Sequence, residues 1–296
     1  MMIYDCFTYF DEKMLLNFRL NYLNNYVDKF VISEANYTHS GKPKKFNFNI
    51  NDYPKFKNKI IYIPVIHKPK GLIRVNTKKK DHETNVKLIL NGYLRENFQR
   101  DQLQNGLGEA NSNDLIIISD VDEIPNLEKI QLASIKDKII FFKQKFLFYK
   151  FNLFYKNRFW HGSRACKKKF LLSPQWLRNV KGKKYSIFRP DVFFSKKKYS
   201  SVYFVEDGGW HFTNLKTAKE IYYKFSNYLH HREFEFSKLR IKDINNMIKK
   251  KISIYNHEVD KSHSKFDRRI KLSILPKKFL PKFLLENLNT YKNWLI

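Results

Sequence analysis

Cysteine, glycine and proline are scarce in this chain of 296 residues, which has two cysteines, nine glycines and nine prolines. Cys6 and Cys166 are too few for a disulfide framework or a cysteine-rich zinc module, and the low glycine and proline content excludes collagen-like and low-complexity chains. No apolar run approaches the roughly 18 residues that span a bilayer. The first residues also lack the basic and apolar regions of a signal peptide, so we expect a cytoplasmic protein.

The sequence nevertheless has the composition of a protein with a folded core. Hydrophobic residues make up 43% of the chain and aromatic residues 17%, which excludes a disordered protein. At roughly 100–200 residues per domain, the length allows one large domain or two small ones.

Basic residues outnumber acidic ones by 57 to 28, for a formal net charge of +29. Residues 1–150 carry a net +7 and residues 151–296 a net +22. This asymmetry suggests a polyanion or an anionic membrane near the second half, although a lysine-rich composition from an A/T-rich genome explains it equally well. The lysine runs lack an RNA-binding or zinc-finger signature, so charge alone does not indicate a nucleic-acid-binding protein.

The first half alternates strand-like and helix-like segments. We predict a helix at residues 12–23, capped by Asp11, and another at 84–104, ended by Gly106 and Gly108. Strands are predicted at residues 2–7, 29–33, 59–65 and 115–118, the last of which is apolar on both faces like a central parallel strand. Strands separated by helices predict an α/β protein with a doubly wound, mostly parallel sheet.

The second half is richer in aromatic strand-like segments, at residues 139–148, 170–172, 185–188 and 203–205. Ser173-Pro174 is typical of a helix start, and residues 217–229 have the apolar stripe of an amphipathic helix. From about residue 238 the chain becomes basic and helical. We therefore predict a core domain at residues 1–235 and a basic helical C-terminal tail at residues 236–296.

Three carboxylates, Asp120, Asp122 and Glu123, follow the apolar strand at residues 115–118. Open α/β sheets bind ligands at the carboxyl ends of their strands. An Asp-x-Asp at this edge can aim two oxygens at one divalent cation, which can then neutralise a diphosphate. Carboxylates after a buried strand are costly to desolvate unless they are paired or metal-bound. The alternative is a capped turn without a ligand.

A second cluster runs from Glu206 to Phe212 and reads Glu-Asp-Gly-Gly-Trp-His-Phe. One of its acids can act as a general base on a hydroxyl. Trp210 can stack on a sugar face and His211 can bind a transition metal. The alternative is a tight turn flanked by core aromatics, with His211 only hydrogen-bonded.

Several short motifs spread over residues 2–235 occur in the same order as similar motifs of a known family. They are Tyr4-Asp5-Cys6-Phe7 with Glu12 and residues 16–20 downstream, residues 31–44, Arg95-Glu96, Gln99-Arg100, residues 119–125, Gly209-Trp210-His211-Phe212 and residues 224–230. In this order they resemble glycosyltransferase family 17, whose best-known members add the bisecting N-acetylglucosamine to the core β-mannose of N-glycans.

The resemblance implies a GT-A type nucleotide-sugar-binding fold, a UDP-sugar donor, a divalent cation (Mn²⁺ or Mg²⁺) and inversion at the anomeric carbon. It implies that Asp120 and Asp122 hold the metal and the diphosphate, with His211 as a third metal ligand. In the same way it assigns Glu34 to the nucleoside and Arg95 and Arg100 to phosphate, which arginine binds in a bidentate manner. A solvated helix face is the alternative for the two arginines.

The general base that takes the acceptor proton is expected to be Asp207, with Glu206, Glu123 and Glu233 as rivals. Glu233 lies where residues 230–234 have one residue more than the family pattern His-x-Glu-Phe. The sequence thus predicts a soluble, metal-dependent, inverting glycosyltransferase that transfers N-acetylglucosamine from its UDP-sugar to a glycan or lipid-linked acceptor. A nucleotidyltransferase or similar metal-dependent nucleotide enzyme, and a non-enzymatic nucleic-acid-binding protein, are the alternatives.

The C-terminal tail combines an apolar stripe with lysines. The stripe consists of Leu275, Phe279, Phe283, Leu284 and Leu288, and the lysines are Lys271, Lys277, Lys278, Lys282 and Lys292. Basic amphipathic segments can lie in a membrane interface, so we expect peripheral contact with an anionic membrane rather than with nucleic acid. The alternative is that the stripe packs back on the core domain, and Pro276 and Pro281 prevent a single long helix.

Overall fold

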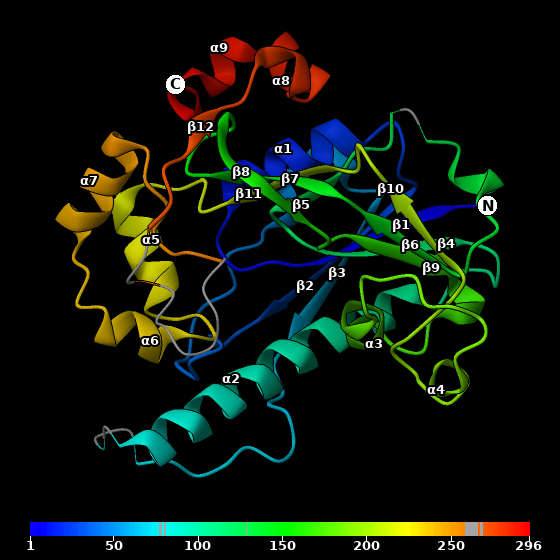
Figure 1. Cartoon of the computed structure of the whole chain (residues 1–296), viewed down its shortest axis with the longest axis horizontal. Coiled ribbons are helices and arrows are strands. Elements are labelled where there is room, and N and C mark those ends of the chain that lie inside the picture. The colour runs from blue at the N-terminus through cyan, green and yellow to red at the C-terminus, as the bar shows by residue number, and fades with distance from the viewer. Residues whose placement is uncertain (77–78, 80, 129, 258–265, 267–268) are drawn as a thin grey trace.

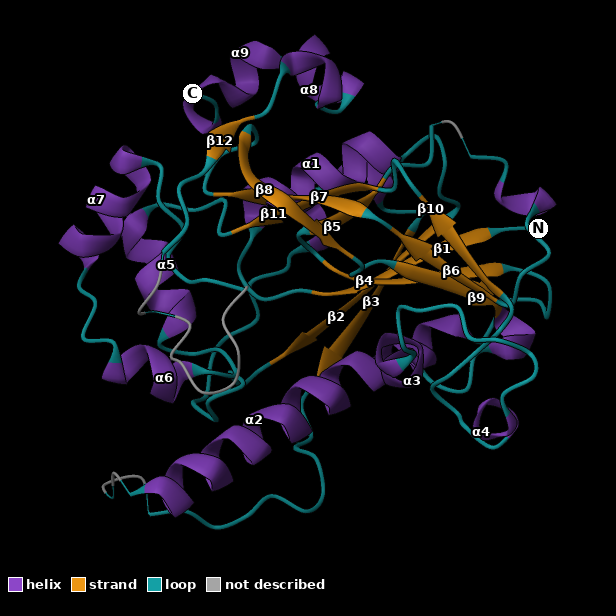
Figure 2. Ribbon diagram, viewed as in Figure 1, coloured by secondary structure: helices purple, strands orange, loops and turns teal. Residues whose placement is uncertain are grey.

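The computed structural model describes residues 1–76, 79, 81–128, 130–257, 266 and 269–296. Two β-sheets form the centre of this part of the chain, and helices surround them (Figure 1). Figure 2 shows the sheets side by side, with the long second helix running below them. The α/β class predicted from the sequence is therefore confirmed.

The first sheet contains the predicted parallel strands. Its strands are β1 (Ile3–Thr8), β2 (Lys29–Ala35), β3 (Ile60–Val65), β4 (Leu115–Asp120), β6 (Ile139–Phe142), β9 (Arg164–Lys167) and β10 (Val202–Val205), in the order β10-β6-β9-β4-β1-β2-β3. Strands β4, β1, β2 and β3 are parallel, whereas β9 is antiparallel to both of its neighbours. Thr8 is in register with Asp120, so the carboxyl ends of β1 and β4 meet at one edge.

The second sheet is mostly antiparallel, which the sequence did not predict. Its strands are β5 (Glu123–Pro125), β7 (Gln144–Phe148), β8 (Leu153–Trp160), β11 (Gly209–Thr213) and β12 (Ser273–Ile274), in the order β12-β8-β7-β11-β5. Only the β7–β11 pair among them is parallel in the described part of the chain. The prediction of a mostly parallel sheet therefore holds for the first sheet and is wrong for the second.

Two glycines allow β11 to approach its neighbours closely. Gly209 has a φ of +117°, and a Cβ atom there would lie 2.2 Å from the carbonyl oxygen of Ile124. At Gly208 a Cβ would lie 2.4 Å from the backbone nitrogen of Lys143. Because no side chain fits at either position, the glycine pair is what lets β11 pair with β5, which places His211 opposite Glu123.

The helices are mostly short. They are α1 (Lys13–Leu23), α2 (His82–Asp101), α3 (Pro174–Asn179), α4 (Pro190–Phe193), α5 (Ala218–Phe225), α6 (His231–Phe236), α7 (Ile241–Lys250), α8 (Lys282–Glu286) and α9 (Leu288–Tyr291). Short 3₁₀ helices occur at Ile50–Asp52, Pro54–Phe56, Gln102–Leu107, Leu132–Ser134, Lys168–Phe170, Lys277–Phe279 and Lys292–Trp294. None of the helices in the described residues is both long and apolar enough to cross a membrane.

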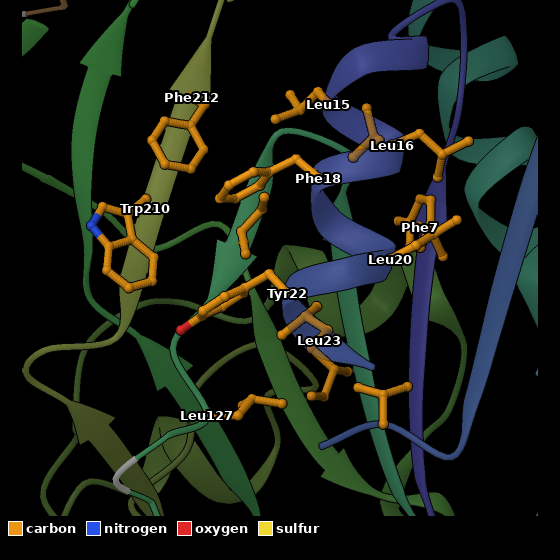
Figure 3. Packing of buried hydrophobic residues seen from close by; sticks show 14 of the residues in the cluster. Phe7, Leu15, Leu16, Phe18, Leu20, Tyr22, Leu23, Leu127, Trp210 and Phe212 are labelled. Carbon is orange, nitrogen blue, oxygen red and sulfur yellow. The ribbon is translucent and has the colours of Figure 1, made fainter. Parts of the chain in front are cut away.

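Helix α1 is buried between the two sheets and forms the centre of the main core. Its apolar side chains contact Phe7 from the first sheet and Trp210 and Phe212 from the second (Figure 3). Phe18 is fully buried, and its ring meets those of Phe151, Phe212 and Tyr291 at centroid distances of 4.9–5.9 Å. A helix with buried residues on most of its surface is expected when it is covered on both sides.

Several local predictions were wrong for identifiable reasons. Asp11 does not cap α1, because Glu12 occupies the cap position and the Asp11 carboxylate accepts a hydrogen bond from Lys216 instead. Residues 170–172 and 185–188 are not strands: the first segment begins at the last residue of a 3₁₀ turn and the second lies in a loop. The segment 139–148 is two strands, β6 and β7, which belong to different sheets on either side of Lys143.

The C-terminal segment contributes to the core, which corrects the expectation that its apolar stripe faces a membrane. Strand β12 pairs with β8, and Leu275, Leu284 and Tyr291 are at most 6% exposed in the main core. Phe283 and Leu288 are half-buried, and Phe279 alone of the predicted stripe is exposed, at 42%. Most of the stripe therefore packs on the protein instead of facing a membrane. The boundary at residue 235 stays a prediction, although residues on both sides of it share one sheet and one core.

Candidate active site

Asp120, the last residue of β4, is neutralised by two arginines. Its Oδ1 lies 2.9 Å from Arg100 Nη2 on α2, and its Oδ2 lies 3.0 Å from Arg178 Nη2 on α3. Burial alone would raise the pKa of Asp120, but the guanidinium groups of Arg178 and Arg100 outweigh burial and hold that pKa far below its usual range. Asp120 is therefore a carboxylate that stays ionised and organises two cations.

Glu123 has all its acceptor capacity used inside the protein. Its carboxylate accepts hydrogen bonds from Trp160 Nε1 at 2.6 Å, Arg178 Nη1 at 2.6 Å and the backbone N–H of Asp120 at 2.8 Å. The residue is 1% exposed. A carboxylate with these donors cannot reach an acceptor hydroxyl without losing them, so the geometry does not favour Glu123 as the base.

Asp122 and His211 are brought together, as the sequence predicts for two metal ligands. Asp122 Oδ1 lies 3.5 Å from His211 Nε2, and Asp122 Oδ2 lies 3.5 Å from Lys224 Nζ on α5. Burial would raise the pKa of Asp122, but Lys224 and His211 lower it to about 2. The His211 ring stacks on Phe146 at a centroid distance of 4.9 Å and an interplanar angle of 9°, which fixes its orientation.

The Asp122–His211 pair fits one divalent cation as two ligands. Two atoms bound to the same ion at about 2.1 Å lie about 3.0–3.5 Å apart, and the measured separation is 3.5 Å. The two arginines occupy both oxygens of Asp120. No group of three or more His, Cys, Asp or Glu residues is arranged to hold a metal within the described residues. The site thus suits a cation that completes its coordination with phosphate oxygens and water.

Glu12 and two lysines form a charged group beside Asp122 that the sequence analysis missed. Lys224 Nζ lies 3.5 Å from Glu12 Oε1, and Lys216 Nζ lies 3.8 Å from the same oxygen. Burial would raise the pKa of Glu12, but Lys216 and Lys224 lower it. Glu12 and Lys224 both lay within the motifs that resemble the family, which is the one signal that pointed to them.

A buried ion pair holds the acidic turn in place. Arg19 on α1 and Asp5 on β1 are both fully buried, with Arg19 Nη2 2.6 Å from Asp5 Oδ1. Arg19 Nη1 also donates to the backbone oxygens of Asp120 at 3.1 Å and Glu123 at 2.7 Å. One guanidinium therefore ties β1 to the turn between β4 and β5.

A pocket of about 260 Å³ opens beside these residues. Its aromatic wall consists of Tyr9, Phe10, Tyr37 and Tyr228, and its charged wall includes Glu12, Glu96, Arg100, Asp120, Asp122 and Lys224. Aromatic side chains beside a charged floor suit a ligand with a flat ring at one end and a charged group at the other. The pocket lies at the carboxyl ends of β1 and β4, the edge predicted from the sequence.

Three residues assigned to donor binding lie outside the described lining of this pocket. Glu34 is fully buried, and its carboxylate accepts from Lys44 and from the backbone N–H groups of Asn47 and Phe48. Arg95 donates to the carbonyl oxygen of His39, a lining residue. Glu34 and Arg95 thus position loops around the pocket, whereas Arg100 lines it.

Trp210 is the third of these residues and lies in the main core. It is 4% exposed, its indole N–H donates to the carbonyl oxygen of Phe279 at 2.8 Å, and its ring packs against Tyr22. This burial leaves no ring face for a sugar, so the geometry contradicts the stacking role predicted for Trp210.

The predicted base and all three of its rivals also lie outside the described pocket lining. Asp207 and Glu206 are on the exposed turn between β10 and β11, where they pair with Lys145 and Lys143. Glu233 on α6 pairs with His230, whose Nδ1 is 2.7 Å from Glu233 Oε1. His230 itself lines the pocket. The base role of Asp207 stays a prediction that this geometry does not favour.

Comparison with known proteins decides the family. The model of glycosyltransferase family 17 matches residues 1–296. The chain belongs to glycosyltransferase family 17. The match therefore extends over residues 236–296 as well as residues 1–235.

Two curated proteins are similar to part of this family 17 chain. Both are named beta-1,4-mannosyl-glycoprotein 4-beta-N-acetylglucosaminyltransferase, one from Homo sapiens and one from Rattus norvegicus, and each is 28% identical over 127 residues. The aligned region is 42% of this chain and 22% and 21% of the respective relatives. The chain thus spans about a fifth of the length of the curated relatives it matches.

Proposed function

We propose that this family 17 chain is a metal-assisted, inverting glycosyltransferase that uses a UDP-sugar, with UDP-N-acetylglucosamine as the expected donor. The acceptor is a hydroxyl of a glycan or of a lipid-linked glycan. The observation that carries the proposal is the Asp122–His211 pair at 3.5 Å, next to a pocket with aromatic and charged walls. The sugar follows from the names of the two relatives.

The chain's own residues divide the work of holding such a donor. Asp122 and His211 would hold Mn²⁺ or Mg²⁺, which supplies positive charge to the diphosphate leaving group. Arg100 and Lys224 line the same pocket and offer further positive charge, while Asp120 keeps Arg100 and Arg178 in place. The aromatic wall gives the uracil ring a surface to stack on.

Inversion requires one displacement at the anomeric carbon. The acceptor oxygen forms a bond to that carbon as the bond to the diphosphate oxygen breaks, and the hydroxyl proton passes to a carboxylate. Glu12 is our choice for this carboxylate, because it lines the pocket and lies beside Lys224 and Asp122. Glu96 also lines the pocket, but Arg100 lies 2.8 Å from its carboxylate, closer than Lys224 at 3.5 Å or Lys216 at 3.8 Å lies to that of Glu12.

The test is a screen of UDP-sugars for donor hydrolysis and transfer, with and without Mn²⁺. We expect release of UDP from UDP-N-acetylglucosamine that depends on the metal. Asp122→Asn should lower the rate about 10²-fold or more, as the loss of one preorganised charge contact does. Asp52→Asn is the matched control, because Asp52 pairs with Lys13 on the surface. No UDP release from any UDP-sugar, together with pyrophosphate release when the chain is given UTP and a sugar 1-phosphate, would refute the proposal in favour of a nucleotidyltransferase.

A further inference from the structure

The loop at residues 181–199 presents four large apolar side chains to solvent. Phe188 is 87% exposed, Phe193 76%, Phe194 90% and Ile187 61%. The two most exposed of these, Phe188 and Phe194, flank the short helix α4, which lies at the rim of the molecule beyond α3 (Figure 1). Single exposed apolar residues are ordinary, whereas several in one short segment mark an interaction site.

The loop is held at its base, so the exposed residues occupy a defined place. The indole N–H of Trp176 on α3 donates to the carbonyl oxygen of Lys196 at 2.6 Å. The backbone N–H of Lys181 donates to the carbonyl oxygen of Lys197 at 2.7 Å, and Lys184 forms a β-bridge with Tyr199. These contacts close the loop on α3, the helix whose Arg178 contacts Asp120.

Basic side chains surround the apolar ones. Residues 181–199 contain six lysines, one arginine and a single acid, Asp191. Asp191 is already paired with Arg189 and Lys198. Three cations, those of Lys183, Arg189 and Lys198, lie 5.6–5.9 Å from the centroid of the Tyr185 ring. The loop therefore combines exposed aromatic rings with a strong local excess of positive charge.

We propose that residues 181–199 form a membrane-docking loop whose partner is an anionic lipid bilayer. Phe188, Phe193 and Phe194 insert into the interfacial region, and the surrounding lysines contact anionic headgroups. Peripheral binding of this kind depends on buried apolar area together with attraction between basic side chains and anionic lipid. Charge complementarity supports a bilayer, and Ile187, which has no ring to stack on a base, favours lipid over nucleic acid.

This loop differs from the C-terminal stripe in the property that matters for membrane binding. Leu275 and Leu284 of that stripe are buried in the core, and Phe279 is 42% exposed. The inference goes beyond the proposed function, because vesicle binding is measured without a donor or an acceptor. Failure of one proposal therefore does not decide the other.

The first experiment is co-sedimentation with vesicles of phosphatidylcholine alone and of phosphatidylcholine mixed with phosphatidylserine. We expect binding to the anionic vesicles, and a drop of about tenfold or more in partitioning for the variant Phe188→Ser, Phe193→Ser, Phe194→Ser, since it removes the apolar area that inserts. Phe236→Ser, at a residue 51% exposed on α6, is the matched control and should bind like the unmodified chain. Equal vesicle binding by the triple variant and the unmodified chain would refute the docking role of this loop.

A comparison of two lysine variants tests whether the basic side chains of the loop contact anionic headgroups. Lys196→Gln with Lys197→Gln should weaken binding to anionic vesicles, whereas Lys249→Gln with Lys250→Gln on α7 should not. All four lysines are exposed, so the two variants remove the same charge from different places. The same loss of vesicle binding in both variants would mean that net charge alone attracts the chain to anionic vesicles. This result would refute the docking loop.

A fluorescence probe reports insertion directly. Cys6 and Cys166 are at most 1% exposed, so a thiol-reactive, polarity-sensitive dye can be attached selectively after Phe194→Cys. We expect brighter, blue-shifted emission when anionic vesicles are added, and no change for the dye attached after Phe236→Cys. A response to a single-stranded oligonucleotide but not to vesicles would overturn the proposal in favour of nucleic acid.

Discussion

Arg19 is the residue on which the geometry of the acidic turn depends most. It pairs with Asp5 out of solvent and donates to the backbone oxygens of Asp120 and Glu123. Removing one partner of a buried pair leaves an uncompensated charge, which costs about 3–5 kcal/mol. We therefore expect Arg19→Ala to lower the free energy of unfolding by that amount, measured by urea denaturation.

Helix α1 supplies the control for this prediction. Lys13 pairs with Asp52 at 2.7 Å, but the Lys13 side chain is 69% exposed. Exposed ion pairs contribute about 0–1 kcal/mol, so Lys13→Ala should change stability little. Similar losses in the two variants would mean that the burial of Arg19 does not carry the effect.

Glu12 and Asp207 can be compared as candidate bases by one pair of variants. We expect Glu12→Gln to lower kcat about 10²-fold or more, in the range typical of a lost general base, with little change in the KM for the donor. Asp207→Asn should leave kcat near normal, because Asp207 lies on an exposed turn with Lys145. The opposite pattern would return the role to Asp207, as the sequence predicts.

The sequence predicted the site residues that depend on strand ends and missed those that depend on tertiary contacts. Asp120 and Asp122 follow an apolar strand, so their edge of the sheet could be inferred. Arg178 reaches Asp120 from 58 residues away, through the short helix α3, and nothing local in the sequence marks that contact. The stacking role predicted for Trp210 was wrong for a related reason. The sequence around an aromatic residue near acids is the same whether its ring faces a ligand or the core.

At the scale of elements, the parallel strands could be predicted and the second sheet could not. Helices or long loops separate the strands β1, β2, β3 and β4, and β4 begins with four apolar residues, which the sequence shows directly. Residues 139–148 form one aromatic-rich segment that resembles a single strand, and only the fold divides it between two sheets at Lys143. Pairings such as β11 with β5 join residues 209–211 to 123–125, a distance along the chain that periodicity does not report.

The role of helix α8 in the core is tested by one truncation of a side chain. Leu284 is fully buried in the main core, so Leu284→Ala should lower the free energy of unfolding by about 2–5 kcal/mol. Lys282→Ala, two residues away on the same helix with a side chain 76% exposed, should change it by less than about 0.5 kcal/mol. Urea denaturation followed by fluorescence and circular dichroism provides the measurement.

An independent C-terminal tail would give a different result. If residues 236–296 unfolded separately, Leu284→Ala would leave the transition of the remaining chain unchanged and alter only a minor one. A single transition that shifts to lower urea in Leu284→Ala would show that α8 belongs to the same cooperative unit as α1.

For the molecule as a whole, the carboxylates of the site and the net charge both predict lower stability at acidic pH. The site contains carboxylates whose pKa values lie below those of an unfolded chain: Asp122 at about 2, and Asp120, Glu12 and Glu96 in the same direction. A carboxylate whose pKa is lower in the folded state stabilises the fold at pH values above its unfolded pKa of about 4. This stabilisation is lost as the pH falls through the pKa of the folded state. The net charge of +29 also becomes more positive on acidification, which adds repulsion.

We therefore expect the free energy of unfolding to fall steadily between about pH 5 and pH 2, with Asp122 contributing on the order of 2–3 kcal/mol. Urea denaturation across this range in about 0.1 M and about 1 M salt separates the two causes, because the screening length falls from about 10 Å to about 3 Å. Repulsion from net charge is largely screened in the higher salt, whereas the buried pairs of Asp122 and the partly buried pairs of Asp120 are screened much less. A pH dependence that persists in high salt and is smaller in Asp122→Asn would assign it to the site, and one that disappears in high salt would assign it to surface charge instead.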